Sequence, residues 1–261
     1  MKSIDEVLHE LEEIIHYSIE HNDRVGYFAS LYYKVTAKVK AGIVAGEFED
    51  GARMEKLDVI FAQRYIDAYH QWRKGEPVTG SWKVAFESSS KRSLLALQHL
   101  LLGINAHINL DLGIAATLTA DGTDMRAIYR DFKSINDVIA SLTYGVINNL
   151  RMISPFLSVL GLKAANSNSM LIQFSITSAR DGAWVFAEEL MDHKADERHK
   201  CINVRDEQIN KLGMDIAHTK GMMRFMVWVI RLFEKKNVGR NIEILHTHKK
   251  KQWHDMHEVQ K

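Results

Sequence analysis

The alternation of apolar and polar residues repeats with the period of an α-helix over most of the chain. Only two prolines are present, and both fall between periodic segments. The pattern predicts an all-α fold, a multi-helix bundle around a central buried helix at about residues 82–119. The predicted helices are residues 4–20, 24–45, 52–74, 82–119, 124–149, 155–162, 167–196, 201–212 and 217–235.

No linker divides this helical pattern into parts. The breaks KGEPVTGS and TADGTD are short and contain turn-forming residues, and Ser154-Pro155 has the cap and first-turn residues of a new helix. We therefore expect one all-helical domain over residues 1–245. Residues 246–261 are rich in histidine and lysine and lose the apolar periodicity, which predicts a polar C-terminal tail.

Composition narrows the class of protein. The formal net charge of +1 gives no field that would attract nucleic acid. The single cysteine, Cys201, excludes a disulfide framework within the chain and a cysteine-rich zinc site. The acidic N-terminus is unlike a signal peptide, and the most apolar window, GMMRFMVWVIRLFEKK, is too short to span a bilayer. We expect a cytoplasmic protein that binds a small-molecule substrate or ligand, and a homo-oligomer is compatible with this expectation.

The predicted central helix contains six polar groups that are costly to bury, within QHLLLGINAHINLDLGIAATL. At about 100° per residue they form two stripes. The ionisable stripe is His99, His107 and Asp111, and the amide stripe, which only hydrogen-bonds, is Gln98, Asn105 and Asn109. Gly103 lies between the two histidines on the ionisable side. Its missing side chain predicts an unfilled volume for a second ion or a small substrate.

His107 and Asp111 stand one helical turn apart. This spacing suits two ligands of one metal ion, or an aspartate that orients a histidine. His99 is about 12 Å from His107 along the helix axis and is too far away to share an ion directly. The pattern leaves three interpretations open: a structural pair, with the amide stripe bonded to neighbouring backbone, a metal site, or a metal-free acid/base or binding pocket.

Asp58 falls within the buried stripe of the predicted helix 52–74, so its carboxylate needs a partner. A metal ion shared with His107 and Asp111 would serve, and so would Arg64 or Arg180.

A second polar stripe lies on the helix predicted at residues 167–196. Arg180, Trp184 and Glu188 recur at spacing four, and a guanidinium beside an indole can hold an anionic or planar group. Glu189 and His193, also four apart, are a further candidate ligand pair, although their polar surroundings favour a solvated face.

The segments RVGYFASLYYKVT, GEFEDGARMEKLDVIFAQRYIDAY, SWKVAFE and QHLLLGINAHINLDLGIA together resemble the bacterial domain-of-unknown-function family 5995. The resemblance is dense over residues 24–116, weaker over SARDGAW and absent from the last forty or so residues. It implies an all-helical fold without an established activity. It also implies that the family's motif includes Asp58, Arg64, His99, Asn105, His107, Asn109 and Asp111.

The spacing of Leu102, Gly103, His107 and Asp111 is also similar to that of the helical zinc-dependent phospholipase C and single-strand nuclease group. This chain lacks the proline and second histidine that follow in that group, and its N-terminal tryptophan. The similarity therefore extends only to the geometry of one helix.

The first functional hypothesis is a metal-dependent enzyme that acts on a small molecule. The metal ligands would be Asp58, His107 and Asp111, and the catalytic residues His99, His107 and Arg180. His99 would be a second-site ligand or general base, and Arg180 would orient an anionic substrate. Zinc would support a hydrolase, and iron would support an oxygen-activating oxidoreductase.

Two further hypotheses belong to other classes. One is a non-catalytic protein that binds a small molecule through the buried polar network. Its ligand contacts would include Arg64, Asn105, Asn109, Tyr65, Trp72 and Trp184. The other is an interaction protein that presents the methionine-rich helix 222–233 to a partner or a membrane surface, which requires this stripe to be exposed in the monomer.

Overall fold

The computed structural model describes residues 3–120, 124–160 and 166–247. Its α-helices are α1 (Ile4–His21), α2 (Val25–Val44), α3 (Gly51–Lys74), α4 (Gly80–Ser89), α5 (Ala96–Ala106), α6 (Leu112–Ala120), α7 (Arg126–Ile153), α8 (Asn166–Asp192), α9 (Arg198–Ala217), α10 (Gly221–Phe233) and α11 (Val238–Thr247). A π-helical turn, η1 (His107–Asp111), joins α5 to α6, and a 3-10 helix, η2 (Pro155–Leu160), follows α7. Within the described ranges no strand occurs, which confirms the predicted all-α fold.

Local sequence signals fix several helix ends. The Ser3 side chain accepts a hydrogen bond from the Glu6 amide at the start of α1, and the Asp50 carboxylate accepts one from the Arg53 amide at the start of α3. Gly75 ends α3 with a φ of 75°, a left-handed conformation that glycine adopts without steric cost. These caps explain why the helices predicted at residues 4–20 and 52–74 lie close to α1 and α3.

The central helix is shorter than predicted. α5, η1 and α6 form it from Ala96 to Ala120, whereas α4 is a separate helix that ends at Ser89. The backbone amide of Ala96 donates to both carboxylate oxygens of the buried Glu234 at 3.2 Å. A carboxylate at a helix N-terminus is favourable, and this one comes from a segment distant in the chain. The prediction of one helix from 82 to 119 is therefore wrong at its N-terminal part.

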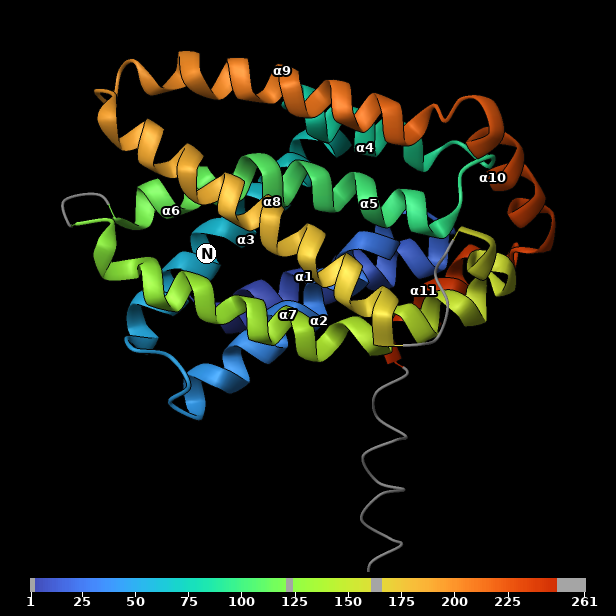
Figure 1. Cartoon of the computed structure of the whole chain (residues 1–261), viewed down its shortest axis with the longest axis horizontal. Coiled ribbons are helices and arrows are strands. Elements are labelled where there is room, and N and C mark those ends of the chain that lie inside the picture. Colours follow the sequence, from blue (N-terminus) through green and yellow to red (C-terminus); the bar gives the residue numbers. More distant parts are fainter. Residues whose placement is uncertain (1–2, 121–123, 161–165, 248–261) are drawn as a thin grey trace, which may run out of the picture.

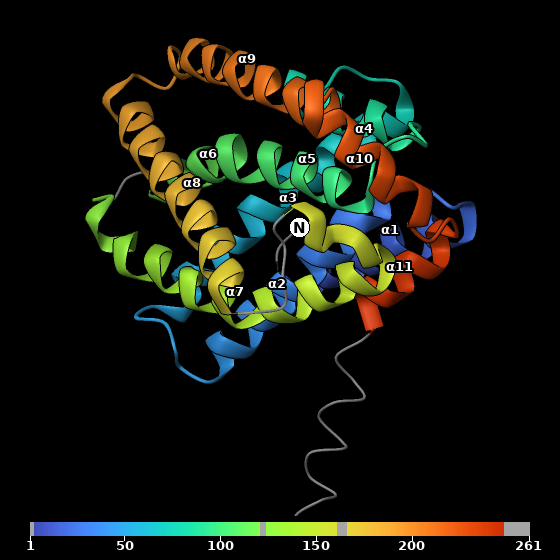
Figure 2. The same ribbon diagram turned by 45° about the vertical axis from the view of Figure 1, so that its right-hand side comes forward.

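The other helices surround this central helix. Figure 1 shows it in green, with α9 above it and α7 below it, and Figure 2 shows α8 crossing on one side between these two layers. By length and composition Ala96–Ala120 could cross a membrane, but 78% of its apolar window is buried inside the protein. A mostly buried window is what the core helix of a bundle presents.

The segment after residue 235 differs from the prediction. α11 was not expected, yet its Ile242 and Leu245 are buried and the helix packs against α1 and α2. His246, assigned to the polar tail, is the penultimate residue of α11, and its Nε2 lies 3.1 Å from Oε1 of Glu12. The rest of the predicted tail, residues 248–261, lies outside the described residues, as do residues 161 and 162 of the predicted helix 155–162.

The methionine-rich helix α10 is amphipathic, and one of its faces is exposed to solvent. Val227 and Ile230 are its buried residues. The exposed apolar side chains of α10 are Met222, Met223, Phe225, Trp228, Leu232 and Phe233. The exposure that the interaction hypothesis requires is therefore present in the monomer.

Candidate functional site

The carboxylate of Asp111 is the centre of a buried polar cluster at the π-helical turn. Its Oδ1 accepts a hydrogen bond from Nε of Arg64 at 2.7 Å, and its Oδ2 accepts one from Nε1 of Trp82 at 2.8 Å. Nδ1 of His107 lies 3.4 Å from the same Oδ2. Burial alone would raise the pKa of Asp111, but the Arg64 guanidinium and these hydrogen bonds hold the pKa below its usual value. Asp111 is therefore ionised and accepts hydrogen bonds from Arg64, Trp82 and His107.

The π-helical turn η1 changes the backbone hydrogen bonding of the central helix. The amide of Leu112 bonds the carbonyl of His107, five residues back, so the helix is locally wider than an α-helix. The carbonyl of Asn109, within the turn, accepts a hydrogen bond from Nε of Arg205 at 3.1 Å. Single π-helical turns occur often at functional sites, and this one contains His107 and Asp111.

The His107 ring is almost fully enclosed by aromatic side chains. It stacks on Phe61 with ring centroids 3.6 Å apart and meets the Tyr32 ring edge at 4.4 Å. Burial lowers the pKa of His107, so the imidazole is neutral at physiological pH. Because Asp111 only accepts hydrogen bonds, the ring proton lies on Nδ1. Nε2 is then a buried acceptor, and it has no hydrogen-bond partner among the described residues.

Asp58 is a second buried group without a partner. The residue is 4% exposed, and its Oδ2 has no hydrogen-bond partner in the described structure. Burial, with a smaller contribution from Glu55, raises the pKa of Asp58 to about 7. The two arginines proposed as partners are engaged elsewhere: Arg64 with Asp111, and Arg180 with neutral acceptors.

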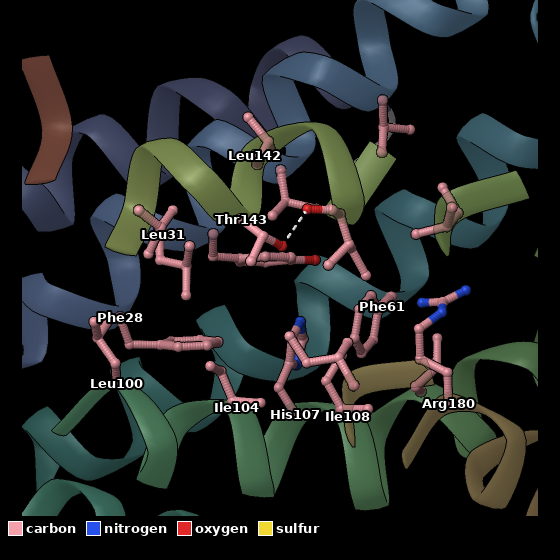
Figure 3. A pocket seen from close by; sticks show the side chains of 18 of the residues that line it. Phe28, Leu31, Phe61, Leu100, Ile104, His107, Ile108, Leu142, Thr143 and Arg180 are labelled. Atoms are coloured by element: carbon pink, nitrogen blue, oxygen red, sulfur yellow. Dashed lines mark hydrogen bonds between the residues drawn. The ribbon is translucent and has the colours of Figure 1, made fainter. Parts of the chain in front are cut away.

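Asp58 and His107 line the same cavity, which has a volume of about 410 Å³. α2, α3, α7, α8 and the central helix formed by α5, η1 and α6 line it, and nearly all of the lining side chains are aliphatic or aromatic. Figure 3 shows Leu142 and Thr143 of α7 facing Ile104 and His107 across this space. A cavity of this size with few polar groups is typical of a small-molecule site.

Arg180 lines one end of the cavity, beyond Phe61 in Figure 3. Its guanidinium is buried, lies over the Phe132 ring at 4.5 Å, and donates through Nε to Oδ1 of Asn136 at 2.8 Å. A second donor, Nη2, bonds the Phe132 carbonyl. Within the described chain no carboxylate forms an ion pair with Arg180: Asp181 acts on it electrostatically but is paired with Lys133. Burial lowers the pKa of Arg180 to about 9. The guanidinium is therefore a buried cation whose hydrogen-bond partners are neutral.

The amide stripe serves a structural purpose. Nδ2 of Asn105 donates to the Ile209 carbonyl at 2.9 Å, and Nδ2 of Asn109 donates to Oδ1 of Asn105 at 3.0 Å. Nε2 of Gln98 donates to the Ile216 carbonyl at 2.8 Å. These bonds attach the central helix to α9. Asn105 and Asn109, predicted to contact a ligand, do not line the cavity.

The volume predicted beside Gly103 is filled, and this prediction is wrong. A Cβ at Gly103 would lie 2.4 Å from Cγ of Phe28, so the glycine admits the phenylalanine ring and leaves no space for an ion or substrate. His99, on the same side, is buried with its ring 5.8 Å from that of Tyr27. Burial lowers the pKa of His99 to about 3, and this residue does not line the cavity.

The predicted aromatic contacts also lie outside the cavity wall. Tyr65 packs edge-on against Phe28 and tilted against Trp82, whereas Nε1 of Trp184 donates to Glu188 at 2.8 Å. A separate stack, between Trp72 and Phe86, has centroids 5.8 Å apart. These residues stabilise the core around the site.

The aliphatic wall was not predicted. It includes Ile135, Ile139, Leu142 and Val146 of α7, whose helical spacing is the same as that of an ordinary core stripe. Nothing in their sequence distinguishes a cavity wall from a packed interface. Trp82, the donor to Asp111, was also missed, although a buried indole usually needs an acceptor.

The described residues contain one trio of potential metal ligands with ligand atoms within 4.8 Å of one another. It consists of Glu189, His193 and Cys201. The predicted metal ligands Asp58, His107 and Asp111, all within the described residues, do not form such a trio.

Fold and site together define the class: an all-helical protein with an apolar cavity whose wall contains a buried carboxylate, an imidazole and a guanidinium. The chain belongs to the family of unknown function DUF5995, whose model matches residues 4–219. The family resemblance is thus confirmed and extends on both sides of residues 24–116. No curated protein and no solved structure matches the chain.

Proposed function

We propose that this protein binds a mainly apolar small molecule with an anionic head group, such as a long-chain carboxylate, in the cavity between α5 and α7. The observation that carries this proposal is a buried guanidinium, Arg180, in the wall of an otherwise aliphatic cavity of about 410 Å³. Apolar burial would supply most of the binding free energy, and the charged head group would set the orientation.

The electrostatics of the wall favour an anion over a cation. Arg180 has no carboxylate partner within the described chain, so a ligand carboxylate would supply the missing counter-ion through charge-assisted hydrogen bonds. Asp58, in the same wall, has a pKa of about 7 and is largely neutral below that pH. Binding of an anion should therefore weaken as pH rises above about 7, because Asp58 becomes negative.

The experiment compares two ligands with the same chain and different head groups. Dodecanoate and dodecanol would displace an environment-sensitive fluorescent fatty acid from the purified protein. Because a hydrogen bond to a charged group contributes about 1.5–3 kcal/mol, dodecanoate should bind at least about tenfold more tightly. Arg180→Met should abolish this difference, whereas the matched control Arg130→Met, on a side chain that is 79% exposed, should leave it unchanged.

A cavity-filling variant tests the location separately. Ile104→Trp places an indole in the cavity and should weaken both ligands together, with circular dichroism used to verify the fold. If both ligands bind equally and Arg180→Met changes neither, the anionic head group is wrong. If Ile104→Trp leaves binding intact, the cavity is not the site.

A second candidate function is a metal-dependent hydrolase or oxygenase at the same cavity. The observation that favours it is the pair of buried, unpartnered atoms Oδ2 of Asp58 and Nε2 of His107 in one wall. Carboxylate and imidazole suit both zinc and iron, and Asp111 would then orient His107 from behind. Metal analysis of untagged protein tests this: an equivalent of zinc or iron that Asp58→Asn and His107→Asn each remove would support it, and metal that survives both would refute it.

A further inference from the structure

A cluster of three metal-ligating side chains lies at the junction of α8 and α9, away from the cavity. Glu189 lies in the last turn of α8, His193 is the first residue after this helix, and Cys201 lies in the first turn of α9. One ligand atom from each residue lies within 4.8 Å of the other two. Glu189 is exposed, and the other two are half-buried, so the cluster is open to solvent on one side.

The backbone that presents these side chains is fixed. Nε of Arg198 donates to the Leu190 carbonyl at 2.8 Å and to the His193 carbonyl at 3.3 Å, which closes the turn between the two helices. Beneath the turn, Cys201 packs against a small apolar cluster of Phe186, Leu190 and Ile209. The ligands therefore lie on two helices and their connection, which are held together before any ion binds, and this lowers the entropic cost of binding.

The three side chains are available to an ion. None of them makes a side-chain hydrogen bond or ion pair within the described chain, and Cys201 is a free thiol. Arg205 interacts electrostatically with Glu189, but its Nε bonds the Asn109 carbonyl and its guanidinium lies over the Phe186 ring. Glu189 therefore keeps its carboxylate free for coordination.

The chemistry of the set points to zinc. Zinc bonds to sulfur, nitrogen and oxygen are about 2.0–2.3 Å long, so ligand atoms in a tetrahedral shell are about 3.3–3.8 Å apart. A small change in side-chain rotamers would bring atoms now within 4.8 Å to these separations. A thiolate and an imidazole favour zinc over magnesium or calcium, which prefer all-oxygen shells.

We propose that Glu189, His193 and Cys201 bind one Zn²⁺ ion, with water as the fourth ligand on the solvent side. Binding would release the thiol proton of Cys201 to the solvent, since the thiolate is the ligand. The ion would join α8 to α9 at their shared turn. This site is independent of the cavity and of any metal that Asp58 and His107 would hold.

The experiment titrates the untagged full chain with Co²⁺ after chelation and dialysis. Cobalt reports tetrahedral coordination in the visible spectrum and thiolate coordination as a near-ultraviolet charge-transfer band. Because the chain contains one cysteine, this band reports Cys201 alone. We expect a one-equivalent transition with both features, reversed by Zn²⁺ and absent in Cys201→Ser.

Matched variants distinguish coordination by all three residues from binding to the Cys201 thiol alone. His193→Asn and Glu189→Gln should each weaken Co²⁺ binding about tenfold or more, which corresponds to about 1.4 kcal/mol. His199 is an exposed histidine of α9, the helix of Cys201, and is not part of the trio. His199→Asn should therefore leave the titration unchanged. A missing charge-transfer band, or one unaffected by His193→Asn and Glu189→Gln, would overturn the proposal. A metal held by Asp58 and His107 would not produce this band, so the two sites are tested separately.

Discussion

Replacing Asp58 with asparagine should stabilise the protein at alkaline pH, contrary to the usual effect of altering a buried polar residue. Asp58 is 4% exposed, its Oδ2 has no hydrogen-bond partner among the described residues, and burial raises its pKa to about 7. Compared with an ordinary aspartate at 3.8, the shift is roughly three pH units, which corresponds to about 4 kcal/mol of destabilisation once the group is ionised.

The pH window follows from the direction of the shift. Below the unfolded pKa of about 4 the carboxyl is protonated in both states and has no effect. As pH rises from about 4 to about 7, the unfolded chain ionises while folded Asp58 keeps its proton, so the folded state loses stability. Above about 7 the destabilisation is complete. The stability gained through Asp58→Asn should therefore be about 3 kcal/mol larger at pH 8 than at pH 5.

Urea unfolding at the two pH values measures this difference. The buried amide introduces its own desolvation cost of about 1–3 kcal/mol, but that cost is the same at both pH values and cancels in the comparison. Asp137→Asn, at an exposed position within α7, provides the control. A difference between pH 8 and pH 5 below about 1 kcal/mol would show that Asp58 is ionised beside a favourable partner, and the argument for an unpaired carboxylate would fail.

Three further predictions concern the core around the site. Asp111→Asn should destabilise the protein by about 1.5–3 kcal/mol in urea unfolding, since it removes the buried carboxylate that pairs with the half-buried Arg64, and a loss below about 1 kcal/mol would mean that the ion pair is unimportant. Gly103→Ala should lower the free energy of unfolding by about 1–3 kcal/mol, because the new methyl group would overlap Phe28. Gly145→Ala, where an added Cβ would meet nothing within 4 Å, should instead raise it by up to about 1 kcal/mol. Equal effects of the two substitutions would contradict the packing of Phe28 against Gly103. Ile242→Ala should lower stability by about 2–5 kcal/mol because this side chain is fully buried, and an unchanged unfolding midpoint would show that α11 is not part of the core.

Local sequence signals were sufficient for much of the helical architecture. The apolar periodicity of residues 4–74 predicts α1, α2 and α3 because each of these helices buries one face against its neighbours. The same periodicity within each predicted helix also predicts the burial of Asp58, His107 and Asp111, since a residue's position around a helix depends only on its spacing from the apolar stripe. The proximity of His107 to Asp111 follows from the same spacing.

Tertiary contacts decided where other helices begin and end. α5 begins at Ala96 beside the carboxylate of Glu234, which lies 138 residues further along the chain. No local pattern marks that contact, so the sequence from 82 to 119 looks like one helix. α11 likewise owes its position to packing of Ile242 against the first two helices, and ten residues are too few to form a stable helix alone.

The partners of the ionisable groups also depended on the fold. Periodicity places Asp58, Arg64 and Arg180 on buried or partly buried helix faces, but pairing depends on how helices cross, and a helix rotated by one residue would exchange the partners. The fold pairs Arg64 with Asp111, directs Arg180 to Asn136, and leaves Asp58 in a cavity wall without a partner. The cavity itself is a property of helices that do not close completely against each other, and the same apolar stripe would describe either a packed core or a binding site.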